Sequence, residues 1–276
     1  MPEEKIIGIF DSGYGGLSVL LEAVRRLRDV RYLYYADTDH VPYGSRSNDE
    51  ILLFSDAAVR HLTAYGADAV IIACNTASAV SASYLREKFD LPIVAMEPAV
   101  RPALREGDAR RVLVMATPVT LREEKLKNLI RREHGEDRID LLPMPELVEL
   151  AEREDFDGPA AETYIRKQLT GYNPAQYSAI VLGCTHFNYF RPLLRRILDA
   201  DGFTDIHLIE GSAGTVRRAA SLLNLPYAAE VPDAAGCDLT AGVQIRYFCS
   251  GREVTNPGER EHISHLLHQL AAGRKI

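Results

Sequence analysis

The amino-acid sequence predicts an α/β protein of two pseudo-symmetric domains, each with a mostly parallel sheet flanked by helices. Apolar runs of four to six residues alternate with longer stretches of helical periodicity, a pattern typical of parallel α/β sheets. Most of these runs are fully apolar, as strands covered on both faces should be. Two of the runs are followed within two residues by a cysteine, Cys74 and Cys184, and then by small polar residues at a predicted helix start. This recurrence indicates that the second half of the chain repeats the first.

Nine apolar runs are predicted to form strands: Ile6–Phe10, Tyr32–Ala36, Ala69–Ala73, Ile93–Met96, Val112–Ala116, Ile139–Leu142, Ala179–Leu182, Ile206–Ile209 and Ile245–Cys249. A chain of 276 residues is long enough for about two domains. No low-complexity linker marks a boundary, so the division follows from the apparent symmetry. We expect residues 1–96 with 210–276 to form the domain around Cys74, and residues 97–209 to form the domain around Cys184.

Capping patterns predict where two of the helices begin. Ser47 and Glu50 form a capping box that opens a helix, and Gly66 closes it. Apolar residues recur at helical spacing between them, at Ile51, Leu52, Phe54, Ala58 and Leu62. Thr120 with Glu123 indicates another helix start of the same kind.

The composition restricts the kinds of function that the chain can have. Its 46% hydrophobic and 26% charged residues are ordinary for a globular protein, and a formal net charge of −7 without a basic arm argues against nucleic-acid binding. The first residues carry Glu3 and Glu4 and do not resemble a secretory signal, and no apolar run is long enough to cross a bilayer. The four cysteines lack close metal-ligand spacing. We therefore expect a cytoplasmic protein with reduced thiols, without a membrane or nucleic-acid partner.

The positions of Cys74 and Cys184 favour a chemical role over a structural one, although a buried cysteine is more often structural. Each follows its strand at the turn into a helix, where free backbone amides and the helix dipole are expected to lower the thiol pKa. Cys237 and Cys249 lack that setting, and we interpret both as structural.

Small polar residues follow the two thiols, namely Asn75, Thr76 and Thr185. They are compatible with ordinary helix caps, but beside a pair of thiols their amides and hydroxyls are also suited to bind a carboxylate. The loop 37–46, which contains Tyr, Gly and Ser residues directly after a strand, is either a surface loop or a flap over a small ligand.

The segment 11–18 is rich in glycine and lies between a strand and a helix, so a dinucleotide site is one interpretation. The spacing fits only partly, because Ser18 stands where a third glycine or alanine is expected, although Asp37 could serve as the acidic partner. A tight strand-to-helix turn is the alternative, and it leaves Asp11 and Ser12 without a role.

His186 lies two residues after Cys184 and permits two further interpretations. One is a hydrolase in which His186 is the base, and the other is a zinc site of Cys74, Cys184 and His186. Neither explains why both halves end in matching thiols. His262, His265 and His268 recur along a predicted helix near the carboxyl end, and we interpret them as a solvated face.

Four ordered blocks, at residues 8–17, 41–45, 73–78 and 182–186, resemble the signature blocks of the glutamate racemases within the cofactor-independent amino-acid racemases. The resemblance runs from residue 6 to about residue 225. The histidine after Cys184 and Thr185 is similar to glutamate racemases, whereas aspartate racemases typically carry a glutamate there.

The resemblance implies an active site between two α/β domains, with no cofactor and no metal. Cys74 would take the α-proton from D-glutamate and Cys184 from L-glutamate. Asp11 would assist Cys74, while Glu152 and His186 would assist Cys184. The substrate-binding residues implied in this way are Asp11, Ser12, Tyr43, Gly44, Asn75, Thr76, Thr117, Thr185 and His186.

The resemblance also implies partners and a biological role. The substrates would be L- and D-glutamate, the protein a homodimer, and its role the supply of D-glutamate for peptidoglycan. Some relatives are activated by a cell-wall precursor through an amino-terminal extension. Because only five residues precede the first predicted strand, we expect no such activation. A racemase for aspartate or another acidic amino acid, and a two-lobed amino-acid-binding module, remain as alternatives.

Overall fold

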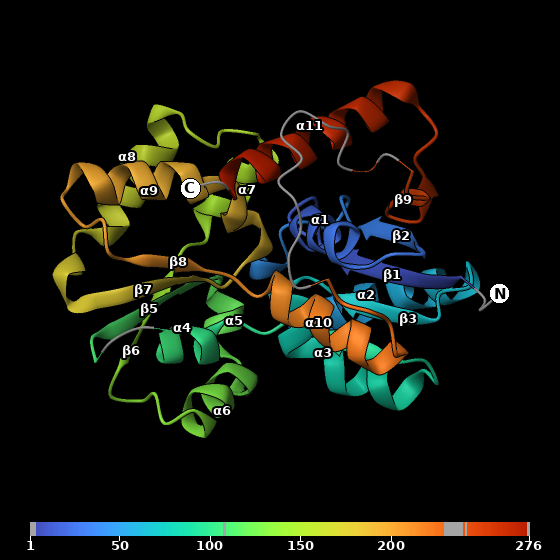
Figure 1. Ribbon diagram of the computed structural model, residues 1–276, viewed down its shortest axis with the longest axis horizontal. Helices are drawn as coiled ribbons and strands as arrows, with labels where there is room; N and C mark the ends of the chain where they lie inside the picture. The colour runs from blue at the N-terminus through green and yellow to red at the C-terminus, as the bar shows by residue number, and fades with distance from the viewer. Residues whose placement is uncertain (1–3, 107–108, 229–239, 241, 275–276) are drawn as a thin grey trace.

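The computed structural model describes residues 4–106, 109–228, 240 and 242–274. Two sheets lie side by side, and helices pack above and below each of them (Figure 1). The α/β class expected from the sequence is therefore confirmed.

The first sheet contains six strands among the described residues, in the spatial order β10, β9, β2, β1, β3, β4. Their bounds are β10 (Arg252–Glu253), β9 (Ile245–Cys249), β2 (Val30–Ala36), β1 (Lys5–Asp11), β3 (Ala69–Ile72) and β4 (Ile93–Ala95). All neighbouring strands are parallel except β10, which runs antiparallel to β9.

The second sheet has four strands in the described part of the chain, all parallel: β6 (Ile139–Pro143), β5 (Arg111–Ala116), β7 (Tyr177–Leu182) and β8 (His207–Ile209). Its order β6, β5, β7, β8 repeats the order β2, β1, β3, β4 of the first sheet. The predicted pseudo-symmetry is therefore present in the topology. All nine predicted strands form, and the short polar strand β10 is an addition to them.

The helices connect and cover these strands. They are α1 (Leu17–Arg26), α2 (Asn48–Ala64), α3 (Asn75–Lys88), α4 (Val100–Glu106), α5 (Pro118–Arg122), α6 (Glu124–Arg132), α7 (Glu146–Glu152), α8 (Pro159–Leu169), α9 (Arg191–Ala200), α10 (Ser212–Leu223) and α11 (Pro257–Gly273), with the 3₁₀ helices η1 (Tyr43–Ser45), η2 (Pro174–Gln176) and η3 (Thr185–Phe190). None of the helices in the described residues is long and apolar enough to cross a membrane.

Strand β1 shows why the strands are apolar throughout. Ile7 and Ile9 belong to the core cluster that contains Leu20 of α1, whereas Phe10 belongs to the cluster that contains Leu62 of α2. Alternate side chains thus enter two cores, one on each face of the sheet.

The predicted start of α2 is confirmed, and the second predicted helix start is wrong. Ser47 and Glu50 form the capping box that opens α2, and Gly66 follows the helix with a φ of +86°. Thr120, however, lies inside the short helix α5. That helix begins at Pro118, two residues after β5 ends at Ala116. Thr117 caps it by accepting a hydrogen bond from the Thr120 amide.

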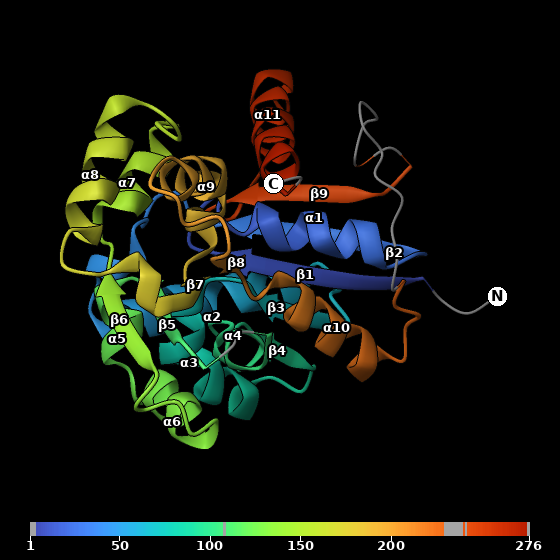
Figure 2. The ribbon, with the colours of Figure 1, turned by 60° about the vertical axis from the view of Figure 1, so that its left-hand side comes forward.

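The chain returns to the first sheet after β8. Helix α10 packs against α1, β3 and β4, strand β9 pairs with β2, and α11 contacts both α1 and the segment η3 of the second half (Figures 1 and 2). The predicted domain boundaries, after residue 96 and before residue 210, fall in the two segments that join the sheets. The division itself stays a prediction.

Candidate active site

The carboxyl ends of β1, β3, β5 and β7 meet between the two sheets. Thr185, after β7, donates a hydrogen bond of 3.0 Å from Oγ1 to Oδ2 of Asp11 at the end of β1. Thr76, after β3, lies 2.9 Å from Thr117, after β5, through their Oγ1 atoms. The predicted residues at this meeting point are almost fully buried: Asp11, Ser12, Tyr43, Cys74, Asn75, Thr76, Thr117, Cys184, Thr185 and His186.

Cys74 is the N-cap of α3, as its place after β3 predicts. Its Sγ accepts a hydrogen bond of 3.4 Å from the amide of Ala77. The expected lowering of its pKa is nevertheless wrong, because burial raises the pKa of this thiol to about 12. The nearby carboxylate of Asp11 raises it further, and the hydrogen bonds from Ala77 and Ser12 only partly oppose the increase.

Cys184 precedes the 3₁₀ helix η3 and is linked to a histidine and a carboxylate. Its Sγ lies 3.8 Å from Nδ1 of His186, and Nε2 of the same ring lies 2.6 Å from Oε1 of Glu152. Burial lowers the pKa of His186, but hydrogen bonds with Cys184 and Glu152 outweigh it and raise the pKa well above its usual range. Burial likewise raises the pKa of Glu152, and its interactions with His186 produce a net lowering.

Asp11 is a fully buried carboxyl group that accepts a hydrogen bond from Thr185 and whose charge acts on Cys74. Burial raises its pKa from 3.8 to about 6, and the positive His186 and the hydrogen bonds from Gly13 and Thr185 limit the increase. Asp11 therefore changes its protonation state close to physiological pH.

Asn75 and three threonines place a carbonyl oxygen and three hydroxyl groups at the buried ends of β3 and β5. Asn75 donates from Nδ2 to the sulfur of Met96 at 3.3 Å, and its buried Oδ1 has no hydrogen-bond partner among the described residues. The hydroxyl groups of Thr76, Thr117 and Thr120 form a triangle with sides of 2.9, 3.0 and 3.2 Å. A free carbonyl oxygen and three clustered hydroxyls are suited to bind a small polar ligand.

A family model described as Asp/Glu/Hydantoin racemase matches residues 12–219 of the chain. The chain belongs to this family. The resemblance seen in the four sequence blocks is thereby confirmed, and the protein is an isomerase.

Curated and solved relatives of this racemase-family chain extend over most of its length. The glutamate racemase of Campylobacter curvus (strain 525.92) is 45% identical over 273 residues, which are 96% of this chain and 97% of that protein. The glutamate racemase 2 of Bacillus subtilis (strain 168) is 40% identical over 219 residues, 79% of this chain and 81% of that protein. The Escherichia coli glutamate racemase, solved with L-glutamate and the activator UDP-MurNAc-Ala, is 31% identical with a TM-score of 0.75, covering 97% of this chain and 96% of that one.

The loop 37–46 of this racemase-family protein is folded onto the site. Tyr43 donates from its hydroxyl to Oδ2 of Asp37 at 2.6 Å, and Ser250 donates to Oδ1 at 2.9 Å. A Cβ atom on Gly44 would lie 3.0 Å from Cβ of Thr117, so the loop contacts the second half closely. Its role as a flap over a ligand stays a prediction.

The glycine-rich segment lies against Glu152 and His186 rather than around an open phosphate site. A Cβ on Gly13 would be 2.4 Å from Oε1 of Glu152, and a Cβ on Gly15 would be 2.6 Å from the backbone nitrogen of His186. Asp37, the acidic residue of the dinucleotide interpretation, is bound by Tyr43 instead. The close approach of Glu152 and His186 to the backbone of this segment explains the glycines without a nucleotide.

The remaining sequence predictions have mixed outcomes. Cys249 is buried with its sulfur 3.4 Å from the hydroxyl of Tyr14, and Cys237 lies outside the described residues. His265 and His268 are exposed as expected, but His262 is half-buried and its ring lies against Tyr14. No three His, Cys, Asp or Glu side chains in the described part of the chain are grouped as a metal site would require.

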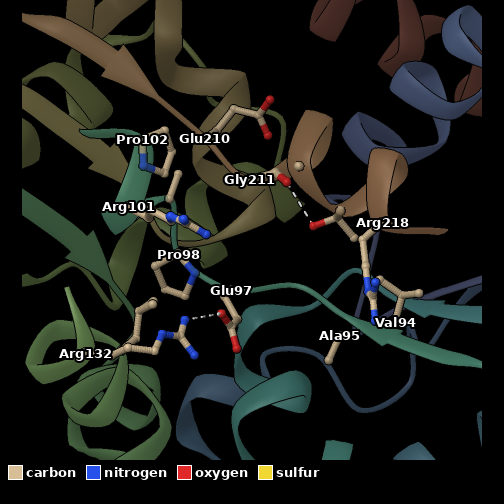
Figure 3. A pocket seen from close by; sticks show the side chains of 14 residues that line it. Val94, Ala95, Glu97, Pro98, Arg101, Pro102, Arg132, Glu210, Gly211 and Arg218 are labelled. Atoms are coloured by element: carbon tan, nitrogen blue, oxygen red, sulfur yellow. Dashed lines mark hydrogen bonds and ion pairs between the residues drawn. The ribbon is translucent and has the colours of Figure 1, made fainter. Parts of the chain in front are cut away.

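A separate pocket lies where the two joining segments run between the sheets (Figure 3). Its volume is about 380 Å³, and its lining includes Glu97 and Arg132, which form an ion pair of 3.7 Å. None of the predicted site residues lines it.

Thr120 is a polar residue of the site that the sequence analysis does not identify, because its pattern predicts a helix start instead.

Proposed function

We propose that this protein is a glutamate racemase that interconverts L- and D-glutamate without a cofactor, using Cys74 and Cys184 as its two acid–base groups. The observation that carries the proposal is that each thiol has ionisable groups near it. Sγ of Cys184 lies 3.8 Å from His186, which contacts Glu152, and the charge of Asp11 raises the pKa of Cys74. The relatives named glutamate racemase support the choice of substrate.

Racemisation removes a weakly acidic proton from the α-carbon and returns one to the opposite face. One base cannot easily reach both faces, whereas two thiols on opposite sides of a planar intermediate can. In this proposal L-glutamate gives its α-proton to Sγ of Cys184, and Sγ of Cys74 delivers a proton to the other face. The reverse reaction exchanges these roles.

The high pKa of Cys74 indicates the protonation state of this thiol before the substrate reacts. A thiol whose pKa is about 12 rests protonated at neutral pH. Cys74 is then prepared to donate, which is the role it takes when L-glutamate is the substrate. For D-glutamate, Asp11 acts as the partner that accepts the proton from Cys74 and allows it to become a base.

The polar side chains between the thiols would bind the substrate. We assign its charged groups to Ser12, Asn75, Thr185 and the cluster of Thr76, Thr117 and Thr120, with Tyr43 and Gly44 closing the site from the loop. Hydroxyl and amide donors at helix starts stabilise the extra negative charge that develops on the α-carboxylate when the proton leaves.

The biological context belongs to the same proposal. A cytoplasmic racemase of this kind would supply D-glutamate for peptidoglycan. We also propose that it works as a homodimer, as is common among the proteins it resembles.

The test is an assay of optical rotation with purified protein and either glutamate enantiomer, without added cofactor. Each enantiomer should be converted to the racemic mixture, and Cys74→Ser and Cys184→Ser should each abolish full turnover. Undiminished activity in either variant would reject the two-thiol assignment.

Assays of the same purified protein distinguish glutamate racemisation from two alternative functions. Aspartate assayed beside glutamate should be converted much more slowly, and a preference for aspartate would make the protein an aspartate racemase. A binding module would be stabilised by glutamate in a thermal melt and would leave its optical rotation unchanged.

A further inference from the structure

The loop between β1 and α1 brings the first half of the chain against the acid–base partners of Cys184. A side chain at Gly13 or Gly15 would collide with Glu152 or His186, at the Cβ distances given above. The loop backbone therefore forms one wall of the niche in which these two side chains lie. The position of that wall determines where Glu152 and His186 are held.

Tyr14, between the two glycines, fixes this wall by its backbone. Its amide donates to Oε1 of Glu152 at 3.4 Å, the oxygen that also contacts His186. Its carbonyl oxygen accepts a hydrogen bond of 3.0 Å from the hydroxyl of Tyr189, in the same 3₁₀ segment as His186. Both bonds cross from the first half of the chain to the second.

The side chain of Tyr14 packs the loop against the carboxyl-terminal part of the chain. Its ring meets the ring of His262 on α11 edge to face, with 5.5 Å between centroids, and its hydroxyl lies 3.4 Å from Sγ of Cys249 at the end of β9. Among the charged groups near this junction, Glu154 lies 3.5 Å from His262. Tyr14 thus links the residues beyond 240 to the wall beside Glu152 and His186.

We propose that Tyr14 is a positioning residue for the Cys184 half of the reaction. It holds Glu152, and through Glu152 the ring of His186, where that ring can exchange a proton with Cys184. In the step concerned, the Cα–H bond of L-glutamate breaks, its electron pair stays on the carbon, and the proton forms an S–H bond on Cys184. This role rests on the function proposed above.

The same loop offers a matched control on the opposite side of the site. A Cβ on Gly16 would lie 2.5 Å from Cβ of Asp11, the partner of Cys74. Gly16 has a φ of −64°, so alanine is compatible with its backbone and acts through this contact. Gly16→Ala should therefore disturb the Cys74 half, and Tyr14→Ala the Cys184 half.

The experiment measures the effect of α-deuterium on kcat/KM for each enantiomer. Enantiomers are equal in free energy, so kcat/KM must be the same in both directions and cannot by itself reveal a one-sided defect. Deuterium on the substrate slows only the first proton removal, by Cys184 from L-glutamate or by Cys74 from D-glutamate.

Tyr14→Ala should lower kcat/KM about tenfold, a part of the 10² to 10⁴ that acid–base assistance typically supplies. It should raise the isotope effect with L-glutamate and lower it with D-glutamate, because the Cys184 step becomes more limiting. Gly16→Ala should produce the opposite pair of changes. Tyr14→Phe keeps the ring on His262 and should return toward the wild-type values.

His262→Ala provides a second route if Tyr14→Ala does not fold, since it removes the ring partner from a half-exposed position on α11. It should shift the two isotope effects in the same directions as Tyr14→Ala. Equal shifts with both enantiomers, or none, in a folded variant would overturn the positioning role. If the wild-type protein did not racemise glutamate at all, the proposed function would fail first and this role with it.

Discussion

Asp11 is the residue of the site in which burial and function oppose each other most directly. Its carboxyl group is fully buried, and its pKa of about 6 in the folded protein exceeds the ordinary value of 3.8. Between these two pH values the folded state binds more protons than the unfolded state, so the stability of the wild-type protein falls as pH rises from about 4 to about 6. The site therefore keeps an ionised Asp11 at the expense of stability.

Replacing this carboxylate should separate stability from activity. Asp11→Asn removes a buried charge whose net cost is about 3 kcal/mol for a shift of roughly 2 pKa units, the bonds from Gly13 and Thr185 included. The free energy of unfolding should rise by about 3 kcal/mol at pH 8 and stay nearly unchanged at pH 3.5. Denaturant unfolding at both pH values measures this, with the exposed Asp90→Asn as the control. A loss of stability at pH 8 would contradict it.

The activity of the same variant carries a second expectation. In the wild-type protein kcat/KM should fall as pH drops through about 6, because protonated Asp11 no longer accepts a proton from Cys74. In Asp11→Asn the rate should be low throughout and this acidic limb should be missing. A pH profile of both proteins tests the point, and an unchanged limb would assign it to another group.

At this scale the sequence predicted those residues whose setting is local. Cys74 and Asp11 follow apolar strands directly, so their place at a sheet edge can be read from neighbouring residues. Thr120 could not be identified, because its hydroxyl reaches Thr76 only through the fold of α5. The pKa of Cys74 was expected in the wrong direction, since helix-end amides are visible in a sequence and the depth of burial is not.

The elements of secondary structure were predictable where their pattern was long. The capping box of Ser47 and Glu50 and the apolar face of α2 agree with each other, and both are found. Strand β10, of two polar residues, and helix α5, of five, have no periodicity to detect. Their presence depends on the neighbouring chain, through β9 for the strand and the Thr117 cap for the helix.

Helix α2 gives a prediction about stability alone. Ser47→Ala removes the side-chain acceptor for the amide of Glu50 and should cost about 1 kcal/mol in the free energy of unfolding. Because the cap is exposed and lies outside the site, kcat and KM should not change. Chemical denaturation should show no comparable loss for the exposed Ser264→Ala in α11. An equally stable Ser47→Ala protein would show that this capping box contributes nothing.

At the scale of the whole molecule, the chain just after α11 contacts helix α1 near the beginning of the sequence. Arg274, just after α11, forms an ion pair with the buried Glu22 of α1 and donates to the carbonyl oxygen of Ser18 at 2.8 Å. Burial raises the pKa of Glu22, but Arg274 and Arg26 outweigh it and hold the pKa below 4.5. Nothing in the sequence marks this pairing, since residues more than 250 positions apart share no periodic pattern.

Arg274→Ala should therefore destabilise the protein by about 2 kcal/mol at pH 7, less than a fully broken buried pair because Arg26 still bonds Glu22. The stability due to a lowered carboxyl pKa is present above 4.5 and is lost as pH falls through the folded value. The gap between variant and wild type should thus shrink near pH 3.5 in denaturant titrations. As a control, the free energy of unfolding of the exposed Arg131→Ala variant should stay within about 0.5 kcal/mol of wild type. If the loss of stability in Arg274→Ala did not change with pH, it would not come from the ion pair with Glu22.

The matching thiols predict that the strand order repeats between the two sheets. They do not predict how the two sheets are placed relative to each other, because that depends on side chains such as Thr185 and Asp11, which meet across the interface. That placement brings the strand ends followed by Cys74 and Cys184 to one meeting point. We therefore expect two different groups to handle the proton on the two faces of glutamate.

The most direct measurement follows the α-hydrogen by proton NMR when L-glutamate is converted in heavy water without added cofactor. With two bases, D-glutamate should carry solvent deuterium at its α-carbon from the first turnovers, while the remaining L-glutamate stays unlabelled. Transfer of the original hydrogen into D-glutamate, or early deuterium in the recovered L-glutamate, would contradict the two-thiol account.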